Sequence, residues 1–161
     1  MKELRDLFEH EVKDLYSAEK QLLEALPKMV KASSNPELQK AFSHHLEETK
    51  GQFERMEKIC DKLGINPGNA KCDAMAGLVE EGEDMIKEEA SASVKDAGLI
   101  AAAQRVEHYE IAGYGTAHHF AKALGESEVA DLLEETLNQE KNADTTLNEL
   151  AKQSINEKAM A

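Results

Sequence analysis

Hydrophobic residues recur at steps of three and four positions along most of the chain, as they do on one face of an α-helix. In the first such stripe, for example, Leu15, Leu22 and Leu26 share a face. Turn-forming residues separate several of these stripes. The pattern predicts an all-α protein whose single domain spans residues 1–161, with helices over about 3–32, 36–63, 73–90, 94–124 and 127–153.

Residues with strong positional preferences mark several of the predicted helix ends. Asn35 and Pro36 favour a helix start, because an asparagine side chain accepts hydrogen bonds from the first turn and proline suits the first helical position. Gly64 favours the end of the same helix, since glycine readily takes the left-handed conformation that follows a last turn. Gly125 is expected to end the helix over 94–124.

The connections between the four long helices are short, long and short. The long one covers residues 65–94 and includes the short predicted helix over 73–90. Short connections place consecutive helices antiparallel, whereas a long one can carry the chain back along the bundle. These lengths predict a ferritin-like four-helix bundle with one long crossover that carries an extra short helix between the second and third long helices. Other four-helix proteins share the same lengths.

Ionisable side chains interrupt each of the four long hydrophobic stripes near its middle. They are Glu19, His45, Glu48, Glu107, Glu110, Glu140 and Asp144. A carboxylate buried without a partner costs several kcal/mol, and no lysine or arginine lies on the same stripes near these positions. Bound cations would offset the repulsion, and carboxylate oxygens with an imidazole suit iron or manganese. The sequence therefore predicts a site for two metal ions, Fe or Mn.

The acids follow a similar order in the two halves of the chain. The spacing from Glu19 to Glu48 recurs closely in the second half, so two helical hairpins would face each other across an approximate two-fold axis. Ferritin-like di-iron proteins combine single glutamates with Glu-x-x-His pairs. This chain departs from that pattern, because His45 precedes its glutamate and Asp144 stands where a histidine is expected. The alternative is a polar layer, or a set of edge charges, without metal.

The other histidines suit this site less well. His118 and His119 lie too far along the helix from Glu110 and are expected at the surface or at the end of the bundle. His44 and His108 are rotated away from the neighbouring stripe residues. His108 is therefore expected behind the ligands or at an interface.

Two tyrosines and two glycines flank the predicted site. Tyr16 and Tyr114 stand about one turn from stripe acids, where each can hydrogen-bond a ligating carboxylate or serve as an ordinary core residue. Gly113 and Gly115 each cost a helix up to about 1 kcal/mol relative to alanine. They indicate close approach of another helix, in the bundle or in a partner subunit.

Composition and charge limit the partners and the location. The formal net charge of −13 argues against nucleic acid, because phosphates are bound mainly through lysine and arginine. The charged N-terminus lacks an apolar signal-peptide region, and the longest apolar run, 99–103, is too short to span a bilayer. Cys60 and Cys72 are expected to be free thiols, although a bridge between them stays open. We expect a soluble, cytoplasmic protein that binds neither nucleic acid nor membrane.

Several runs of residues resemble a known bacterial family. They are LYSAEKQLLEALPK (15–28), HLEETKGQ (45–52), KCDAMAGLVEEG (71–82), RVEHYEIAGYG (105–115) and LLEETLNQEKNADTTL (132–147). Over nearly its whole length the chain is similar to the YciF/YciE-like proteins. The resemblance implies a ferritin-like, rubrerythrin-related bundle that forms a homodimer, is produced under stress and holds a di-metal centre. The residues that match the family's motifs are again Glu19, Glu48, Glu107, Glu110 and Glu140, with His45 and Asp144.

The chain also lacks two features of better-known relatives. A rubrerythrin adds a module with paired C-x-x-C motifs for electron delivery, and a cage-forming ferritin continues into a further helix after the position of Leu150. These differences argue against a self-sufficient peroxidase and against a large iron store. A separate electron donor is expected.

The leading hypothesis is a di-iron or di-manganese stress protein that reacts with oxygen or peroxide, and thus an oxidoreductase if it turns over. Bridging ligands would be Glu48 with Glu107 or Glu110, terminal ligands Glu19 and Glu140, and further ligands or orienting residues His45 and Asp144. One alternative is a protein that sequesters iron without turnover. Another is a purely structural helical protein in which a polar core layer fixes the register.

Overall fold

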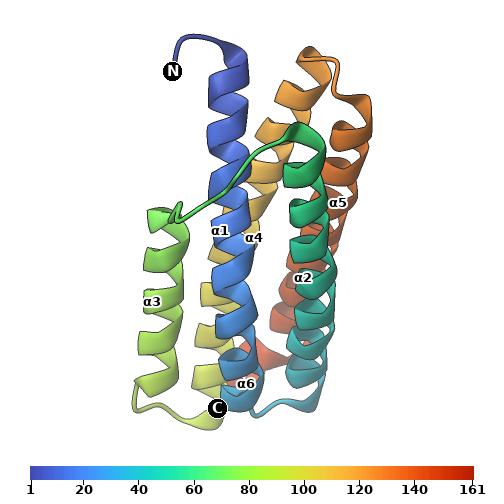
Figure 1. The fold of residues 1–161 in the computed structure, drawn as a ribbon. Helices are drawn as coiled ribbons and strands as arrows, with labels where there is room; N and C mark the ends of the chain where they lie inside the picture. Colours follow the sequence, from blue (N-terminus) through green and yellow to red (C-terminus); the bar gives the residue numbers. More distant parts are fainter.

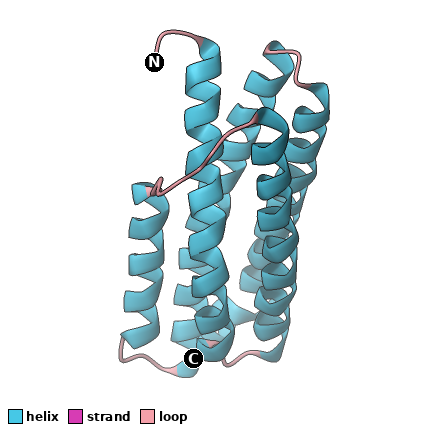
Figure 2. Cartoon of the chain, viewed as in Figure 1, coloured by secondary structure: helices cyan, strands magenta, loops and turns pink.

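The computed structural model describes all 161 residues, and it contains helices and no strand (Figure 2). Its main helices are α1 (Leu4–Ala32), α2 (Pro36–Leu63), α3 (Asp73–Lys87), α4 (Ala92–Ala123) and α5 (Ser127–Leu150). A five-residue π-helical turn, Ala151–Ile155, then leads into the short α6 (Asn156–Ala159). The all-helical prediction is confirmed.

Four long helices lie side by side, and neighbours run antiparallel (Figure 1). Two hairpins, α1–α2 and α4–α5, form the bulk of the molecule, and they meet where α1 packs against α4 and α2 against α5. The shorter α3 packs on the outside of the long helices, against α1 and α4 (Figure 1). The segment that connects α2 to α4 thus adds a helix to one side of the molecule.

The α1–α2 turn follows the predicted signals. The Asn35 side chain accepts hydrogen bonds from the backbone N–H groups of Glu37 and Leu38, at 2.9 and 3.2 Å. Gly64 ends α2 with a φ of 65°, in the left-handed region that favours glycine. A buried acid of α4, Asp96, accepts the backbone N–H groups of Ser34 and Asn35 at 2.8 and 2.9 Å, which ties this turn to the second hairpin.

Three helix boundaries differ from the prediction by two residues or more. Helix α3 ends at Lys87 rather than 90, because Glu88 already has an extended backbone (ψ 137°). Helix α4 begins at Ala92 rather than 94, because the hydroxyl of Ser91 accepts the backbone N–H of Val94. The last helix extends through a π turn to Ala159 instead of stopping near 153.

Two hydrophobic clusters occupy opposite ends of the long helices. One contains Phe8, Leu15, Met56, Ile59, Tyr114 and Leu133. The other contains Met29, Leu38, Phe42, Leu99, Ile100 and Leu147. The stretch between them, at the middle of each long helix, holds the ionisable residues singled out from the sequence.

The two glycines of α4 differ in their surroundings. A Cβ atom added at Gly113 would lie 2.9 Å from Leu15 Cδ2, so the predicted close approach of another helix is confirmed there. A Cβ atom at Gly115 would meet nothing within 4 Å, so no helix of this chain approaches it closely.

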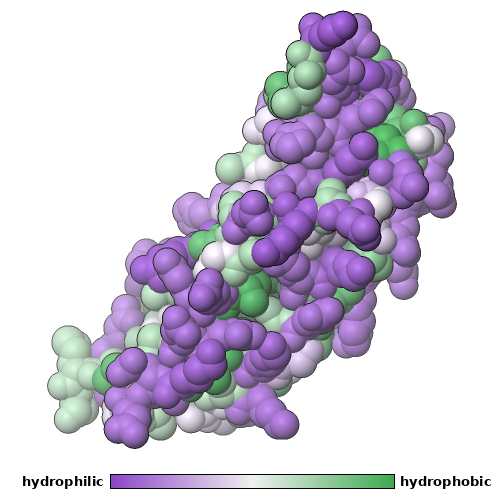
Figure 3. All heavy atoms as spheres, turned by 60° about the vertical axis from the view of Figure 1, so that its left-hand side comes forward, coloured by the Kyte–Doolittle hydropathy of each residue, from purple (hydrophilic) through white to green (hydrophobic).

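The surface is mainly hydrophilic in the view of Figure 3, with scattered hydrophobic residues. Only four large hydrophobic side chains are exposed, namely Met1, Leu4, Val94 and Met160. None of the helices combines the length and the apolar character that a membrane span requires.

Candidate metal centre

Five ionisable side chains from four different helices are buried together at the middle of the bundle. Glu19 comes from α1, His45 from α2, Glu107 and Glu110 from α4, and Glu140 from α5. One ligand atom from each of His45, Glu107, Glu110 and Glu140 lies within 4.8 Å of the others. This arrangement can hold a metal ion.

His45 lies among the acids, where a positive charge is otherwise scarce. Its Nε2 atom is 3.2 Å from Glu107 Oε1 and 3.9 Å from Glu140 Oε2, and its Nδ1 atom is 3.9 Å from Glu48 Oε2. None of these contacts has the directional geometry of a hydrogen bond. One imidazole cannot neutralise four buried carboxylates.

Eight buried polar atoms around this point lack hydrogen-bond partners. They are Glu19 Oε2, both ring nitrogens of His45, Gln52 Oε1, Glu107 Oε2, both oxygens of Glu110, and Glu140 Oε2. A buried polar atom without a partner typically costs about 1–3 kcal/mol, and native proteins contain few of them. The unpartnered atoms here are almost all carboxylate oxygens and imidazole nitrogens, which is the donor set of iron and manganese sites. The residues therefore fit a bound metal.

Burial and mutual repulsion strongly affect how these groups ionise. Burial, reinforced by the charges of Glu140 and Glu19, raises the pKa of Glu110 well above its usual value. Burial and the adjacent Glu107 do the same to the pKa of Glu140. Burial would also raise the pKa of Glu107, but the neighbouring His45 outweighs it and the pKa is lowered. The corresponding attraction of Glu107 overcomes the effect of burial on His45 and raises its pKa well above normal.

Glu19 approaches the cluster from α1 and is held by a tyrosine. The hydroxyl of Tyr114 donates a hydrogen bond to Glu19 Oε1, while Oε2 has no partner. Burial raises the pKa of Glu19 to about 7, although the tyrosine hydrogen bond acts in the opposite direction. Tyr114 thus fills the role of a tyrosine bonded to a site carboxylate. Tyr16 instead packs on Phe53, with ring centroids 5.0 Å apart.

Glu48 lies at the edge of the buried group, beside a polar cavity of about 140 Å³ between α2 and α5. Its side chain is 20% exposed, and Oε1 is 3.5 Å from Nε2 of the exposed His44. The cavity is also lined by His45, Glu107 and Asn142. It therefore connects the outer surface with two of the buried side chains.

Asp144 is not brought into the buried group. Its carboxylate accepts a hydrogen bond from Gln104 at 3.1 Å and lies 3.2 Å from Nε2 of the exposed His108. Both partners are on α4, so Asp144 joins α4 to α5 one turn beyond Glu140. The expectation for His108, a place outside the ligand set, agrees with this contact.

The remaining histidines and the cysteines lie away from the site. His118 is buried, with Nδ1 3.0 Å from the carbonyl oxygen of Ala130, whereas His119 is exposed. Cys60 and Cys72 are both free and buried. The Cys72 thiol lies 3.0 Å from the hydroxyl of Tyr109.

Two residues of α2 that the stripes did not single out act on the site, Gln52 by direct contact and Arg55 through its charge. Gln52 is fully buried, and its amide donates a hydrogen bond to Glu140 Oε1. Arg55, whose side chain is 11% exposed, donates to Thr136 and pairs with Glu135 at 2.6 Å, and its charge acts on Glu19. Arg55 lies outside the hydrophobic stripe of α2, and it acts on the buried acids only through its charge on Glu19. The sequence does contain a signal for Gln52, because this residue follows Glu48 by one helical turn and so lies on the same face of α2.

Comparison with known proteins yields close relatives. The chain is 48% identical to Protein YciF of Escherichia coli (strain K12) over 160 residues, which cover 99% of this chain and 96% of that protein. The crystal structure of that stress protein superposes with a TM-score of 0.93, covering 97% of this chain and 99% of the other. YcfI of Rhodopseudomonas palustris is 42% identical, with a TM-score of 0.88 and coverage of 92% and 94%.

A more distant structure shares the fold. Protein XCC3681 of Xanthomonas campestris pv. campestris is 22% identical, with a TM-score of 0.75 and coverage of 93% and 92%. Residues 3–160 match a family described as a domain of unknown function, DUF892. The resemblance of the sequence motifs to YciF is thus confirmed, and the chain belongs to the DUF892 family.

Proposed function

We propose that the chain is a ferritin-like four-helix bundle that binds two iron or manganese ions between its two helical hairpins and reacts with oxygen or peroxide. The observation that carries this proposal is the set of unpartnered oxygen and nitrogen atoms that α1, α2, α4 and α5 direct to one buried place. Cations would satisfy these atoms and remove the repulsion among the acids.

Six side chains would hold the metals. They are His45, Glu107, Glu110 and Glu140, with Glu19 on the α1 side and Glu48 on the side of the polar cavity. Bound iron or manganese would supply electron transfer to oxygen or peroxide. Metal binding would displace the protons that burial holds on Glu110 and Glu140.

Other side chains would position the ligands and control access. Gln52 orients Glu140, and Tyr114 orients Glu19. The hydrophobic clusters at the two ends of the bundle exclude water from the buried acids along the bundle axis. The polar cavity beside His44 and Glu48 would admit ions and water.

The relatives suggest a role in the stress response and a second candidate function. The Escherichia coli relative is a stress protein, and we extend that setting to this chain. The description of the Rhodopseudomonas palustris relative proposes a structural role. The close His45–Glu107 pair favours that second candidate, because a buried polar layer can fix the register of packed helices.

Reconstitution with iron(II) or manganese(II) tests the proposal. We expect about two metals per chain by elemental analysis, and anomalous scattering from crystals should place them among the six side chains. Glu110→Gln and Glu140→Gln should lose most of the metal, whereas Glu134→Gln, an exposed acid on α5, should not. A protein that binds no metal after reconstitution would support the structural candidate instead.

Turnover separates an enzyme from a store. A metal-loaded protein that consumes peroxide with an added reductant, and loses this activity in Glu140→Gln, acts as an oxidoreductase. Binding without turnover indicates sequestration. Because the chain has no paired C-x-x-C motifs, we also propose a separate electron donor, and a homodimer remains our proposal for the assembly.

A further inference from the structure

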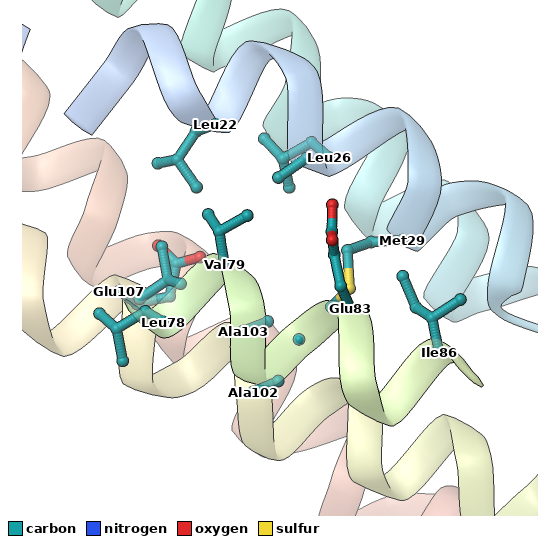
Figure 4. Close-up of a pocket in the computed structure, with 13 residues that line it drawn as sticks. Leu22, Leu26, Met29, Leu78, Val79, Glu83, Ile86, Ala102, Ala103 and Glu107 are labelled. Carbon is teal, nitrogen blue, oxygen red and sulfur yellow. The ribbon is translucent and has the colours of Figure 1, made fainter. Parts of the chain in front are cut away.

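A second cavity reaches Glu107 from a different side of the bundle, beneath α3 (Figure 4). Its walls come from α1, α3 and α4, and they include Leu26, Val79 and Ala103. The cavity holds about 40 Å³, and ten of its thirteen lining residues are hydrophobic. Glu107 therefore contacts two cavities of opposite character, the polar one between α2 and α5 and this apolar one.

Small residues keep the apolar cavity open. Where α3 meets α4, a Cβ atom added at Gly82 would lie 3.9 Å from that of Ala102. Ala25 and Ala103 complete the small side chains of the walls. The cavity exists because α3 covers the α1–α4 side of the bundle, so the helix that lengthens the crossover also forms the roof of this space.

The size and lining of the cavity select its occupant. A water molecule needs roughly 10–15 Å³ of such space together with two to four polar partners. The volume is sufficient, but the polar groups are only Glu107 at the inner end and Glu83 at the rim, which is paired with Lys28 at 2.5 Å. Water would lack partners along the walls, whereas a small apolar molecule loses nothing there.

We propose that this cavity is a binding site for dioxygen, and that dioxygen reaches Glu107 through it while metal ions and water use the polar cavity beside His44 and Glu48. The inference rests on the proposed function, because a dioxygen site next to Glu107 has a use only where that carboxylate holds a metal. It goes further by assigning a substrate, a place and a separate route to each reactant.

Xenon tests the cavity without any metal. Crystals of the metal-free protein under xenon pressure should show an anomalous peak among Leu26, Val79 and Ala103. Ala103→Leu should abolish the peak, and Ala112→Leu, the same change on the exposed face of α4, should retain it. If Ala103→Leu does not fold, Val79→Phe fills the same space from α3. Absence of the peak in the unmodified protein would overturn the proposal.

Oxygen kinetics tests the route. In iron(II)-loaded protein mixed with dioxygen, Ala103→Leu should slow oxidation of the bound iron at least about tenfold, with the iron affinity unchanged and Ala112→Leu behaving as the unmodified protein. Equal oxidation rates in Ala103→Leu and the unmodified protein would refute the route. Failure to bind iron would instead refute the proposed function, and the xenon experiment would still decide whether the cavity takes apolar guests.

Discussion

Gln52 lies fully buried on α2, one helical turn beyond Glu48, and its amide donates a hydrogen bond to Glu140. Because a fixed donor orients the carboxylate it contacts, Gln52→Leu should weaken metal binding by about 10–100-fold. Gln52→Leu leaves Glu140 Oε1 without its donor but also removes the buried, unpartnered Gln52 Oε1, so the stability of the metal-free protein should change by only about 1 kcal/mol. Titration calorimetry with manganese(II) measures the affinity.

The matched control for this substitution is Gln21→Leu. Gln21 is a half-buried glutamine of α1 whose amide donates to the carbonyl oxygen of Cys72, away from the acids. Its replacement should leave the metal affinity unchanged. Equal affinities for Gln52→Leu and Gln21→Leu would show that Gln52 does not position Glu140.

Tyr114, like Gln52, acts on the site through one hydrogen bond to a buried carboxylate. Tyr114→Phe leaves Glu19 Oε1 without its donor, so unfolding should become easier by about 1–3 kcal/mol. The pKa of Glu19, already raised to about 7, should rise further because the lost bond favours the ionised form. Chemical denaturation and infrared titration of the carboxyl band measure the two effects. Tyr16→Phe, which removes a hydroxyl from the packed Tyr16–Phe53 pair, should leave both quantities nearly unchanged.

Asp144 and Gln52 show the limit of prediction from sequence at the scale of single residues, because Asp144 lies outside the buried group and Gln52 lies inside it. Interruptions of the hydrophobic stripes correctly indicated buried positions for Glu19, His45, Glu107, Glu110 and Glu140. A stripe fixes a face only to within about one residue, which is about 100° of rotation. The orientation of α5 then turns Asp144 toward Gln104 and His108 of α4, while a glutamine that no charge argument favours points inward.

At the scale of helices, the two glycines of α4 form a natural comparison. Alanine is better than glycine inside a helix by about 1 kcal/mol, and nothing surrounds the added methyl at position 115. Gly115→Ala should therefore stabilise the protein by about 0.5–1 kcal/mol. Gly113→Ala places its methyl against the buried Leu15, so it should be the less stable variant by at least about 1 kcal/mol. Denaturant unfolding of both variants decides this, and equal stabilities would contradict the close α1–α4 contact.

Helix ends illustrate the same limit for whole elements. The start and end of α2 were predictable because Asn35, Pro36 and Gly64 act through their own backbone and side-chain chemistry. The π turn at Ala151–Ile155 has no comparable local signal. Its buried residues, Ala151 and Ile155, belong to the hydrophobic cluster at that end of the bundle, so packing between distant helices accounts for the extension.

At the scale of the whole molecule, the buried acids predict an unusual pH dependence for the metal-free protein. A carboxyl group whose pKa is higher in the folded state binds more protons when folded, so the free energy of unfolding falls as the pH rises. For Glu19 the free energy of unfolding falls between about pH 4.5 and about pH 7, by an amount on the order of 3 kcal/mol. Glu110, Glu140 and His45 act in the same direction toward higher pH. Denaturant unfolding should give a lower stability at about pH 8 than at about pH 5.5.

Metal provides the control for this dependence. Cations keep the carboxylates ionised without repulsion, so the metal-loaded protein should not lose stability as the pH rises. Metal loading at neutral pH should release protons.

Below about pH 4.5 the pH dependence of stability changes sign. The pKa of Glu107 is lowered in the folded protein, so its favourable ionised form is lost as the pH falls further. A metal-free protein that grows more stable from pH 5.5 to pH 8 would contradict the assignment of raised pKa values to the buried acids.

The way in which α1–α2 and α4–α5 meet has a consequence for how the chain folds. Each hairpin consists of contacts between residues close in sequence, which form quickly, whereas the α1–α4 and α2–α5 contacts join distant segments and form slowly. His45 meets Glu107 only when the hairpins dock. The docking step thus brings four acids together before any metal can hold them, and mild acid should speed refolding by neutralising them. Assembly of the site is then the slow event of folding, and metal supply and folding become coupled in time.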